Sequence, residues 1–138
     1  MYIFKTLVTK SGIEGSGVFA DQDIPKGSIV WKFDSDHDLI LSFEDFEKLD
    51  PETKAEIRKI AYVSPTSGQW VYPPKDDPAR YTNHSEISNN LSAAFDPNVS
   101  GEPFFIANKE IEKGTELTVN YKEFDDSIKH TTPDWMQQ

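Results

Sequence analysis

The densest set of hydrogen-bonding side chains lies at residues 80–89, which read Arg-Tyr-Thr-Asn-His-Ser-Glu-Ile-Ser-Asn. Asn83 and His84 offer directional donors and acceptors, which suit a ligand rich in nitrogen and oxygen atoms. A hydrogen-bonded loop explains an isolated Asn-His pair equally well. No metal site is predicted here, because His37 and His130 show no ligand spacing to His84 and cysteine is absent.

Two further segments could take part in the same chemistry. Gly12, Gly15 and Gly17 follow a predicted strand and would let the backbone approach a ligand closely. Their order differs from the dinucleotide-binding fingerprint, and no Gly-Lys-Ser/Thr closes a phosphate loop. The other segment, residues 114–121, reads Gly-Thr-Glu-Leu-Thr-Val-Asn-Tyr and ends on Tyr121. Taken singly, a β-turn and a packed tyrosine explain both segments.

Short β-rich runs and one helical region must position these segments. Ser42 and Asp50 are residue types that cap helices, and Pro51 suits a first helical position, so two helices are predicted over 43–49 and 51–61. The sequence thus predicts a mainly β fold with a small helical insert. The expected strands are residues 2–8, 18–20, 28–33, 69–72, 91–95, 104–106 and 115–121.

An eight-residue pattern occurs twice, at residues 23–30 and 110–117. Both copies read acid-Ile-x-Lys-Gly-Ser/Thr-x-aliphatic. Gly27 and Gly114 can each supply a positive φ at a turn that precedes a strand. The pattern predicts two similar β-hairpins near the two ends of the chain.

The composition narrows the class of partner. The 138 residues include 24 acids and 14 Lys or Arg, which gives a net charge of −10, and no cysteine. Disulfides, thiolate zinc sites and a cysteine nucleophile are therefore excluded. Such an acidic chain should not hold nucleic acid through its phosphates, and it favours a basic protein partner. No apolar run is long enough for a membrane span and no signal-peptide pattern is present, so the default expectation is a cytoplasmic protein without a membrane partner.

In their order, the three segments resemble the SET-domain family of protein lysine methyltransferases. The family's Gly-x-Gly is met by Gly15-Ser16-Gly17. Its Arg-Phe-x-Asn-His-Ser-Cys-x-Pro-Asn segment is met within residues 80–89, and its Gly-Glu-Glu-Leu-Thr-x-Asp-Tyr segment within residues 114–121. The resemblance spans roughly residues 2–121.

The resemblance implies a fold of short curved sheets with a C-terminal pseudoknot. Residues 82–89 and 116–121 should meet in that pseudoknot. A SET domain over residues 1–121 is expected, followed by a tail, residues 122–138, that packs near the substrate channel.

The resemblance also implies a cofactor, S-adenosylmethionine, and a role for each matched residue. Tyr121 would be catalytic. The cofactor would lie against Glu14, Gly15, Ser16, Gly17, Tyr62, Arg80, Asn83 and His84, and the candidates for the aromatic walls of a lysine channel are Tyr72, Phe124 and Trp135.

The sequence departs from the family at several positions. Glu86 stands where many members carry a zinc-ligating cysteine, and the tail cysteines are missing too, so a zinc-free member is expected. Ser88 replaces Pro and Asn120 replaces Asp. Val119 occupies a position that often carries Phe or Tyr and limits the number of methyl groups, which leaves the product state open.

The implied function is methyl transfer from S-adenosylmethionine to the side-chain amine of lysine in a basic protein. The alternative is a catalytically silent module that binds a Lys-rich partner through its acidic surface. A small β-protein with accidental matches is a third reading. The substrate stays open, and so does a homodimer.

Overall fold

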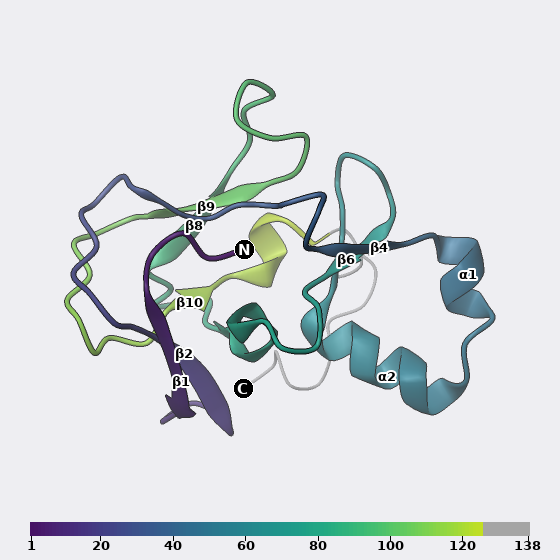
Figure 1. Cartoon of the computed structure of the whole chain (residues 1–138), viewed down its shortest axis with the longest axis horizontal. Helices are drawn as coiled ribbons and strands as arrows, with labels where there is room; N and C mark the ends of the chain where they lie inside the picture. Colours follow the sequence, from purple (N-terminus) through teal and green to yellow (C-terminus); the bar gives the residue numbers. More distant parts are fainter. Residues whose placement is uncertain (126–138) are drawn as a thin grey trace.

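The chain folds into several small sheets rather than one large one, and the computed structural model describes residues 1–125 (Figure 1). Among these residues the strand pairings are antiparallel, except that β7 and β10 pair in parallel. The sheets are β1 (Thr6–Lys10) with β2 (Ser16–Ala20); β3 (Ile29–Trp31), β9 (Phe104–Ala107) and β8 (Leu91–Ala94); β4 (Leu39–Leu41), β6 (Trp70–Tyr72) and β5 (Tyr62–Val63); and β7 (Asn83–His84) with β10 (Thr118–Val119).

Two helices form the predicted insert, α1 (Phe43–Glu47) and α2 (Pro51–Ile60), at the end of the molecule opposite the β1–β2 hairpin (Figure 1). Ser42 and Asp50 accept hydrogen bonds from backbone N–H groups in the first turns, which confirms them as N-caps. Phe46 of α1 stacks on Trp70 of β6 with ring centroids 4.6 Å apart. This aromatic contact ties the insert to the β4–β6–β5 sheet.

None of the helices described within residues 1–125 is long and apolar enough to cross a membrane.

The main core is built from buried side chains of β2, the β3–β9–β8 sheet and segments from the other sheets. Val18, Ile24, Val30, Leu91 and Leu117 are completely buried in it. They come from separate segments of the chain, so their burial holds the small sheets together.

The two copies of the repeated pattern form one structural unit. Ile24 and Ile111, equivalent positions in the two copies, exchange backbone hydrogen bonds of 2.8 and 2.9 Å. Gly27 and Gly114 both have positive φ, 88° and 93°, as the pattern predicts. The expected hairpins are wrong, however, because the strands flanking each turn pair with other strands and the two turns pair with each other.

The parallel pair β7–β10 joins the two segments that the family resemblance brings together. Asn83 pairs with Thr118 and His84 with Val119. The Ser85 N–H donates to the Val119 carbonyl at 2.8 Å and extends the contact. The predicted meeting of residues 82–89 and 116–121 is confirmed.

Several boundaries differ from the sequence prediction. The first strand begins at Thr6 rather than residue 2, because Tyr2 instead makes an isolated bridge to Trp31. The last strand covers only Thr118–Val119, since a 3-10 turn, η2 (Tyr121–Glu123), follows it. The short strands β4 and β5 were not predicted. Residues 126–138 of the expected tail lie outside the described residues.

Candidate active site

The glycine-rich segment forms the turn of the β1–β2 hairpin. The Ser11 N–H donates to the Gly15 carbonyl at 2.8 Å, and Gly15 has a positive φ of 49°. A glycine adopts this conformation without the steric cost of a Cβ atom. The turn leaves Ile13 and Glu14 exposed at its tip.

The Asn83 side chain holds this turn against the C-terminal half of the chain. Its Nδ2 atom lies within hydrogen-bond distance of Ser11 Oγ (3.1 Å), Glu14 O (3.3 Å), Ser16 O (3.2 Å) and Glu116 Oε2 (2.8 Å). An amide group has two N–H donors, so the four acceptors share them. One side chain therefore connects the hairpin turn, β7 and the segment that leads into β10.

The Glu116 carboxylate is the partner that completes this contact. Ser11 Oγ donates to Glu116 Oε1 at 2.7 Å, and Asn83 donates to the other oxygen. The carboxylate lies directly over Gly17: a Cβ atom there would be 2.8 Å from Glu116 Cδ and closer still to Oε2. Gly17 is thus required by the close approach of Glu116.

His84 and Tyr121 form a second connection across the parallel pair. His84 Nδ1 accepts a hydrogen bond from the Tyr121 backbone N–H at 3.1 Å, and the two rings stack with centroids 5.7 Å apart. An accepting Nδ1 assigns the ring proton of the neutral imidazole to Nε2. That atom lies 3.5 Å from Glu86 Oε1, and Glu86 in turn pairs with Lys122 at 2.7 Å.

Burial controls the ionisation of both rings. It lowers the pKa of His84 below its ordinary value, and the neighbouring Glu86 opposes this shift only in part. Burial also raises the pKa of Tyr121 well above its ordinary value, with a smaller contribution from the Asp125 charge. At neutral pH, the imidazole is neutral and the Tyr121 hydroxyl keeps its proton.

A large cavity of about 640 Å³ lies between the hairpin turn and β7. Its wall combines charged, polar and apolar groups, and Tyr121 closes one side. The lining residues are Ile13, Glu14, Ser16, Lys59, Arg80, Tyr81, Thr82, Asn83, His84, Ser85, Glu86, Ile87, Ser88 and Tyr121.

A second, narrow cavity of about 40 Å³ lies on the other side of Tyr121 and Thr82, which line both cavities. Its wall is mostly apolar and aromatic. The lining residues are Tyr2, Trp31, Ile60, Tyr62, Val71, Tyr72, Pro73, Ala79, Thr82, Phe105, Tyr121 and Phe124.

Most of the candidate residues fall at one of the two cavities. Glu14, Ser16, Arg80, Asn83, His84 and Tyr121 line the large one. Gly15 and Gly17 belong to the same hairpin and shape it without lining the cavity. The two channel candidates Tyr72 and Phe124 line the narrow cavity, and Trp135 lies outside the described residues.

Tyr62 is the candidate that the structure places differently. The family resemblance implies a contact with the cofactor, but the Tyr62 ring lines the narrow cavity and packs edge-on against Phe124 with centroids 5.3 Å apart. Its hydroxyl donates to buried Glu102 at 3.0 Å. Tyr62 therefore belongs to the aromatic wall together with Phe124.

Sequence reasoning missed the residues that support the site. Glu116 lies inside a matched motif, so its position in that motif was an available signal. Ser11 and Glu102 carry no such signal, since their partners lie 105 residues away at Glu116 and 40 residues away at Tyr62. Only the folded chain brings them together.

We expect Gly17→Ala to lower the free energy of unfolding by about 1–3 kcal/mol, because the added methyl group must displace the Glu116 carboxylate. Gly12→Ala is the matched control, since a Cβ atom there would meet no heavy atom within 4 Å. Its effect should stay below about 0.5 kcal/mol. Urea denaturation of both variants measures the difference, and equal stability of the two would contradict the role assigned to Gly17.

We expect His84 to titrate below its ordinary pKa of 6.5 in the folded chain. As the pH falls below that value, the unfolded chain binds protons that the folded chain does not, so the free energy of unfolding decreases. Protonation of Nδ1 also removes the acceptor for the Tyr121 N–H. Ring resonances followed by NMR from about pH 8 to pH 4 give the pKa directly, and a value above 6.5 would overturn this assignment.

The comparisons with known proteins agree with this geometry. The SET domain family model matches residues 15–122. A candidate histone methyltransferase of Plasmodium falciparum superposes with a TM-score of 0.56 at 21% identity over 86% of this chain and 93% of that one. Chains of the Polycomb Repressive Complex 2 of Chaetomium thermophilum, one with bound GSK126 and one without ligand, superpose with TM-scores of 0.64 and 0.67 at 25% and 23% identity.

These Polycomb matches cover 92% of this chain but only 17% and 16% of theirs. No curated protein sequence matches the chain. The family model nevertheless spans β2, β7, β10 and Tyr121. The chain belongs to the SET-domain family.

Proposed function

We propose that this protein transfers a methyl group from S-adenosylmethionine to the side-chain amine of lysine in a basic protein. The observation that carries the proposal is that Tyr121 lines both a large cavity with a mixed polar and apolar wall and a narrow aromatic one. In such an arrangement the cofactor and a lysine side chain would occupy separate cavities that adjoin at Tyr121. Membership of a family of lysine methyltransferases supports the same reading.

The large cavity fits the cofactor in size and in charge. About 640 Å³ lies within the usual range for small-molecule sites. Arg80 and Lys59 offer cations for the cofactor carboxylate, while Glu14 and Glu86 offer anions for its amino group. Both signs are needed, because the amino-acid end of S-adenosylmethionine carries both.

Asn83 can serve the turn and the ligand together. Its Nδ2 atom is engaged by the hairpin turn and Glu116, whereas no group among residues 1–125 donates to its Oδ1 atom. The oxygen therefore stays available to accept a hydrogen bond from a ligand. Asn83→Ala should both loosen the turn and remove this acceptor.

The narrow cavity suits the unbranched stem of lysine. Tyr62, Tyr72 and Phe124 form part of a wall that contacts methylene groups favourably and can face a cation with ring surfaces. The aromatic wall thus suits a long side chain that carries an amine.

The reaction requires a neutral amine next to Tyr121. When bound, S-adenosylmethionine would supply a methyl group on a cationic sulfur; an unprotonated amine would form the new N–C bond in line as the C–S bond breaks, and the sulfur would leave as a neutral thioether. Free lysine has a pKa of about 10.4, and an apolar channel lowers it by penalising the charged form. The Tyr121 hydroxyl, protonated because burial raises its pKa, can hold and orient the amine at the junction.

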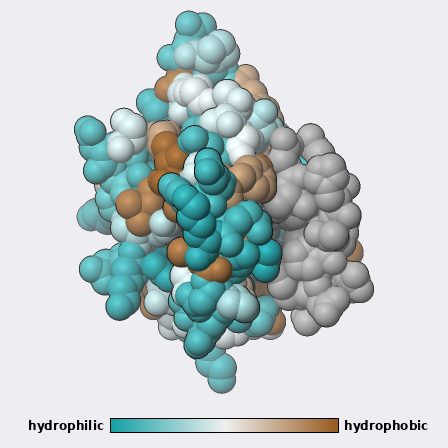
Figure 2. Space-filling model, turned by 90° about the vertical axis from the view of Figure 1, so that its right-hand side faces the viewer, coloured by the Kyte–Doolittle hydropathy of each residue, from teal (hydrophilic) through white to brown (hydrophobic). Residues whose placement is uncertain are grey.

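The charge of residues 34–56, which include β4, α1 and the first part of α2, favours a basic substrate. Residues 34–56 contain nine acids and two lysines, a local net charge of 2 − 9 = −7. Figure 2, which views the side that carries α1 and α2, shows a mostly hydrophilic surface with a few exposed hydrophobic groups. Tyr72 at the narrow cavity pairs with Leu39 of β4, which runs directly into this insert. The acidic surface would raise the local concentration of a Lys-rich segment at the channel.

Titration calorimetry with S-adenosylmethionine tests the cofactor half of the proposal. The wild-type chain should bind one equivalent, and Asn83→Ala should bind at least about tenfold more weakly, because it loses a polar contact and the ordered turn. Asn98→Ala, an exposed asparagine in the turn after β8, is the control and should bind as wild type. The same affinity in all three proteins would remove Asn83 from the site.

The same preparations test the transfer step. Incubated with a lysine-rich protein and the cofactor, the wild type should add mass in steps of a methyl group, and Tyr121→Phe should be slower by about 10²-fold. Cofactor affinity should change little, because the hydroxyl acts at the junction. Near-normal turnover by Tyr121→Phe would exclude the proposed role, and intact binding without transfer by the wild type would favour a silent binding module.

A further inference from the structure

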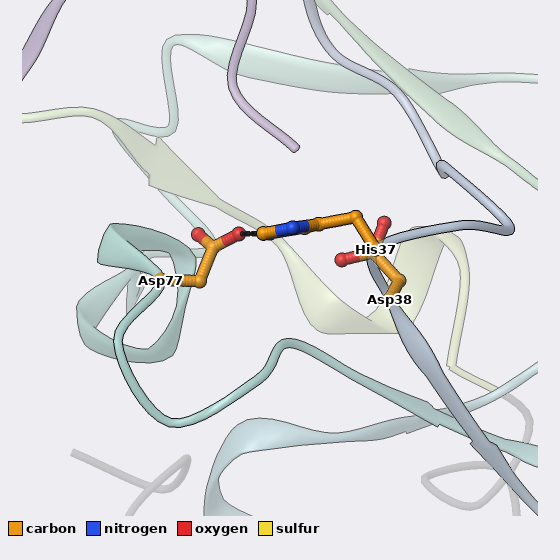
Figure 3. A group of neighbouring side chains, drawn as sticks. All are labelled: His37, Asp38 and Asp77. Atoms are coloured by element: carbon orange, nitrogen blue, oxygen red, sulfur yellow. Dashed lines mark hydrogen bonds and ion pairs between the residues drawn. The ribbon is translucent and has the colours of Figure 1, made fainter.

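A cluster of His37, Asp38 and Asp77 lies outside both cavities (Figure 3). One potential ligand atom from each residue lies within 4.8 Å of the other two. The sequence predicted no metal site, and these residues gave no signal there because Asp77 is 40 positions from His37. The fold alone assembles the cluster.

A backbone N–H group orients each carboxylate. Asp77 accepts from the Ala79 N–H through Oδ1 at 2.7 Å, and its Oδ2 contacts His37 Nε2 directly. Asp38 accepts from the Asp34 N–H through Oδ2 at 2.9 Å. Oriented carboxylates of this kind commonly support metal ligands, because the outer hydrogen bond fixes the direction of the ligating oxygen.

The second oxygen of Asp38 is the unexplained atom. The Asp38 side chain is only 1% exposed, and its Oδ1 atom has no hydrogen-bond partner within residues 1–125. The Met1 amino group lies 3.4 Å from Oδ2 and so approaches the oxygen that already has a partner. A buried carboxylate oxygen without a partner is costly, and the cost falls if a cation binds there.

The cluster holds two carboxylates that are almost fully buried. The Asp77 side chain is 3% exposed, so two aspartates lie almost fully out of solvent on either side of one imidazole. In Figure 3 the His37 ring extends toward Asp77, and one oxygen of Asp38 points to the same side. The Met1 amino group, 3.4 Å from Asp38 Oδ2, offsets only part of this charge, so the two carboxylates could still hold a divalent cation.

We propose that His37, Asp38 and Asp77 bind a divalent cation of the zinc class. One imidazole nitrogen and two carboxylate oxygens are ligands that zinc accepts, with water in a fourth position. The cation would replace the direct contact between His37 and Asp77, and the His37 ring would withdraw slightly to admit it. No thiolate is required, so the absence of cysteine does not affect this site.

Such a cation would brace the approach to the active site. Asp77 is the N-cap of η1 (Pro78–Tyr81), which leads directly to Thr82 and Asn83. His37 and Asp38 belong to the chain before β4. Binding would therefore join the entrance of the insert to the segment that carries Asn83, and this role does not depend on the proposed methyl transfer.

Titration calorimetry of the full chain with Zn²⁺ tests the site. One cation per chain is expected, and His37→Gln and Asp77→Asn should each weaken binding by more than about tenfold. Asp36→Asn and Asp76→Asn are matched controls, since each is an exposed neighbour of a proposed ligand. Equal binding by all four variants and wild type, or no binding by wild type, would overturn the proposal.

NMR of the wild-type chain gives a readout that does not depend on how the variants fold. With ¹⁵N-labelled histidine, Zn²⁺ should shift the Nε2 resonance of His37 and leave that of His84 in place. An unchanged His37 resonance at saturating Zn²⁺ would rule out coordination by this imidazole. Neither experiment requires cofactor or methyl transfer, so either proposal can fail without the other.

Discussion

The contact of Asn83 with Glu116 and the hairpin turn is the interaction on which the site depends. Its amide group is shared between Ser11, Glu116 and two backbone carbonyls of the hairpin turn, so Asn83 joins its own strand to two distant parts of the chain. A carboxylate that loses one of its donors in a partly buried setting loses more than the value of a single neutral hydrogen bond. The absence of a side chain at Gly17 makes room for this contact.

Two consequences follow from that constraint. The hairpin turn is held as one wall of the large cavity, with Glu14 and Ser16 facing it. The segment after Glu116 is directed through β10 beside β7, which brings Tyr121 onto His84. The same contacts thus form a wall of the large cavity and place Tyr121 where that cavity adjoins the narrow one.

Local features of the fold were predictable from sequence, and distant pairings were not. The turns at Gly27 and Gly114 were predicted correctly, because a positive φ is a local requirement. The helix starts at Ser42 and Asp50 were also predicted correctly, because capping is a local interaction. The pairing of the two turns through Ile24 and Ile111 depends on tertiary contacts that no local pattern encodes.

The site followed the same division. The matched motifs correctly indicated Asn83, His84 and Tyr121 as neighbours, because the family resemblance carries long-range information that propensity lacks. Tyr62 had no motif around it, and its aromatic neighbours place it at the narrow cavity. The sequence did not distinguish the buried Asp38 and Asp77 from other acidic residues, because acidic residues are abundant and burial is a property of the fold.

The most direct test of the account is a crystal structure of the chain with S-adenosylhomocysteine. We expect the ligand to lie in the large cavity, with its amino-acid end between the hairpin turn and Asn83 and its sulfur next to Tyr121. The narrow cavity should remain open on the far side of that ring. A ligand bound elsewhere on the chain, or one that fills the narrow cavity, would contradict the division of the site into cofactor and lysine halves.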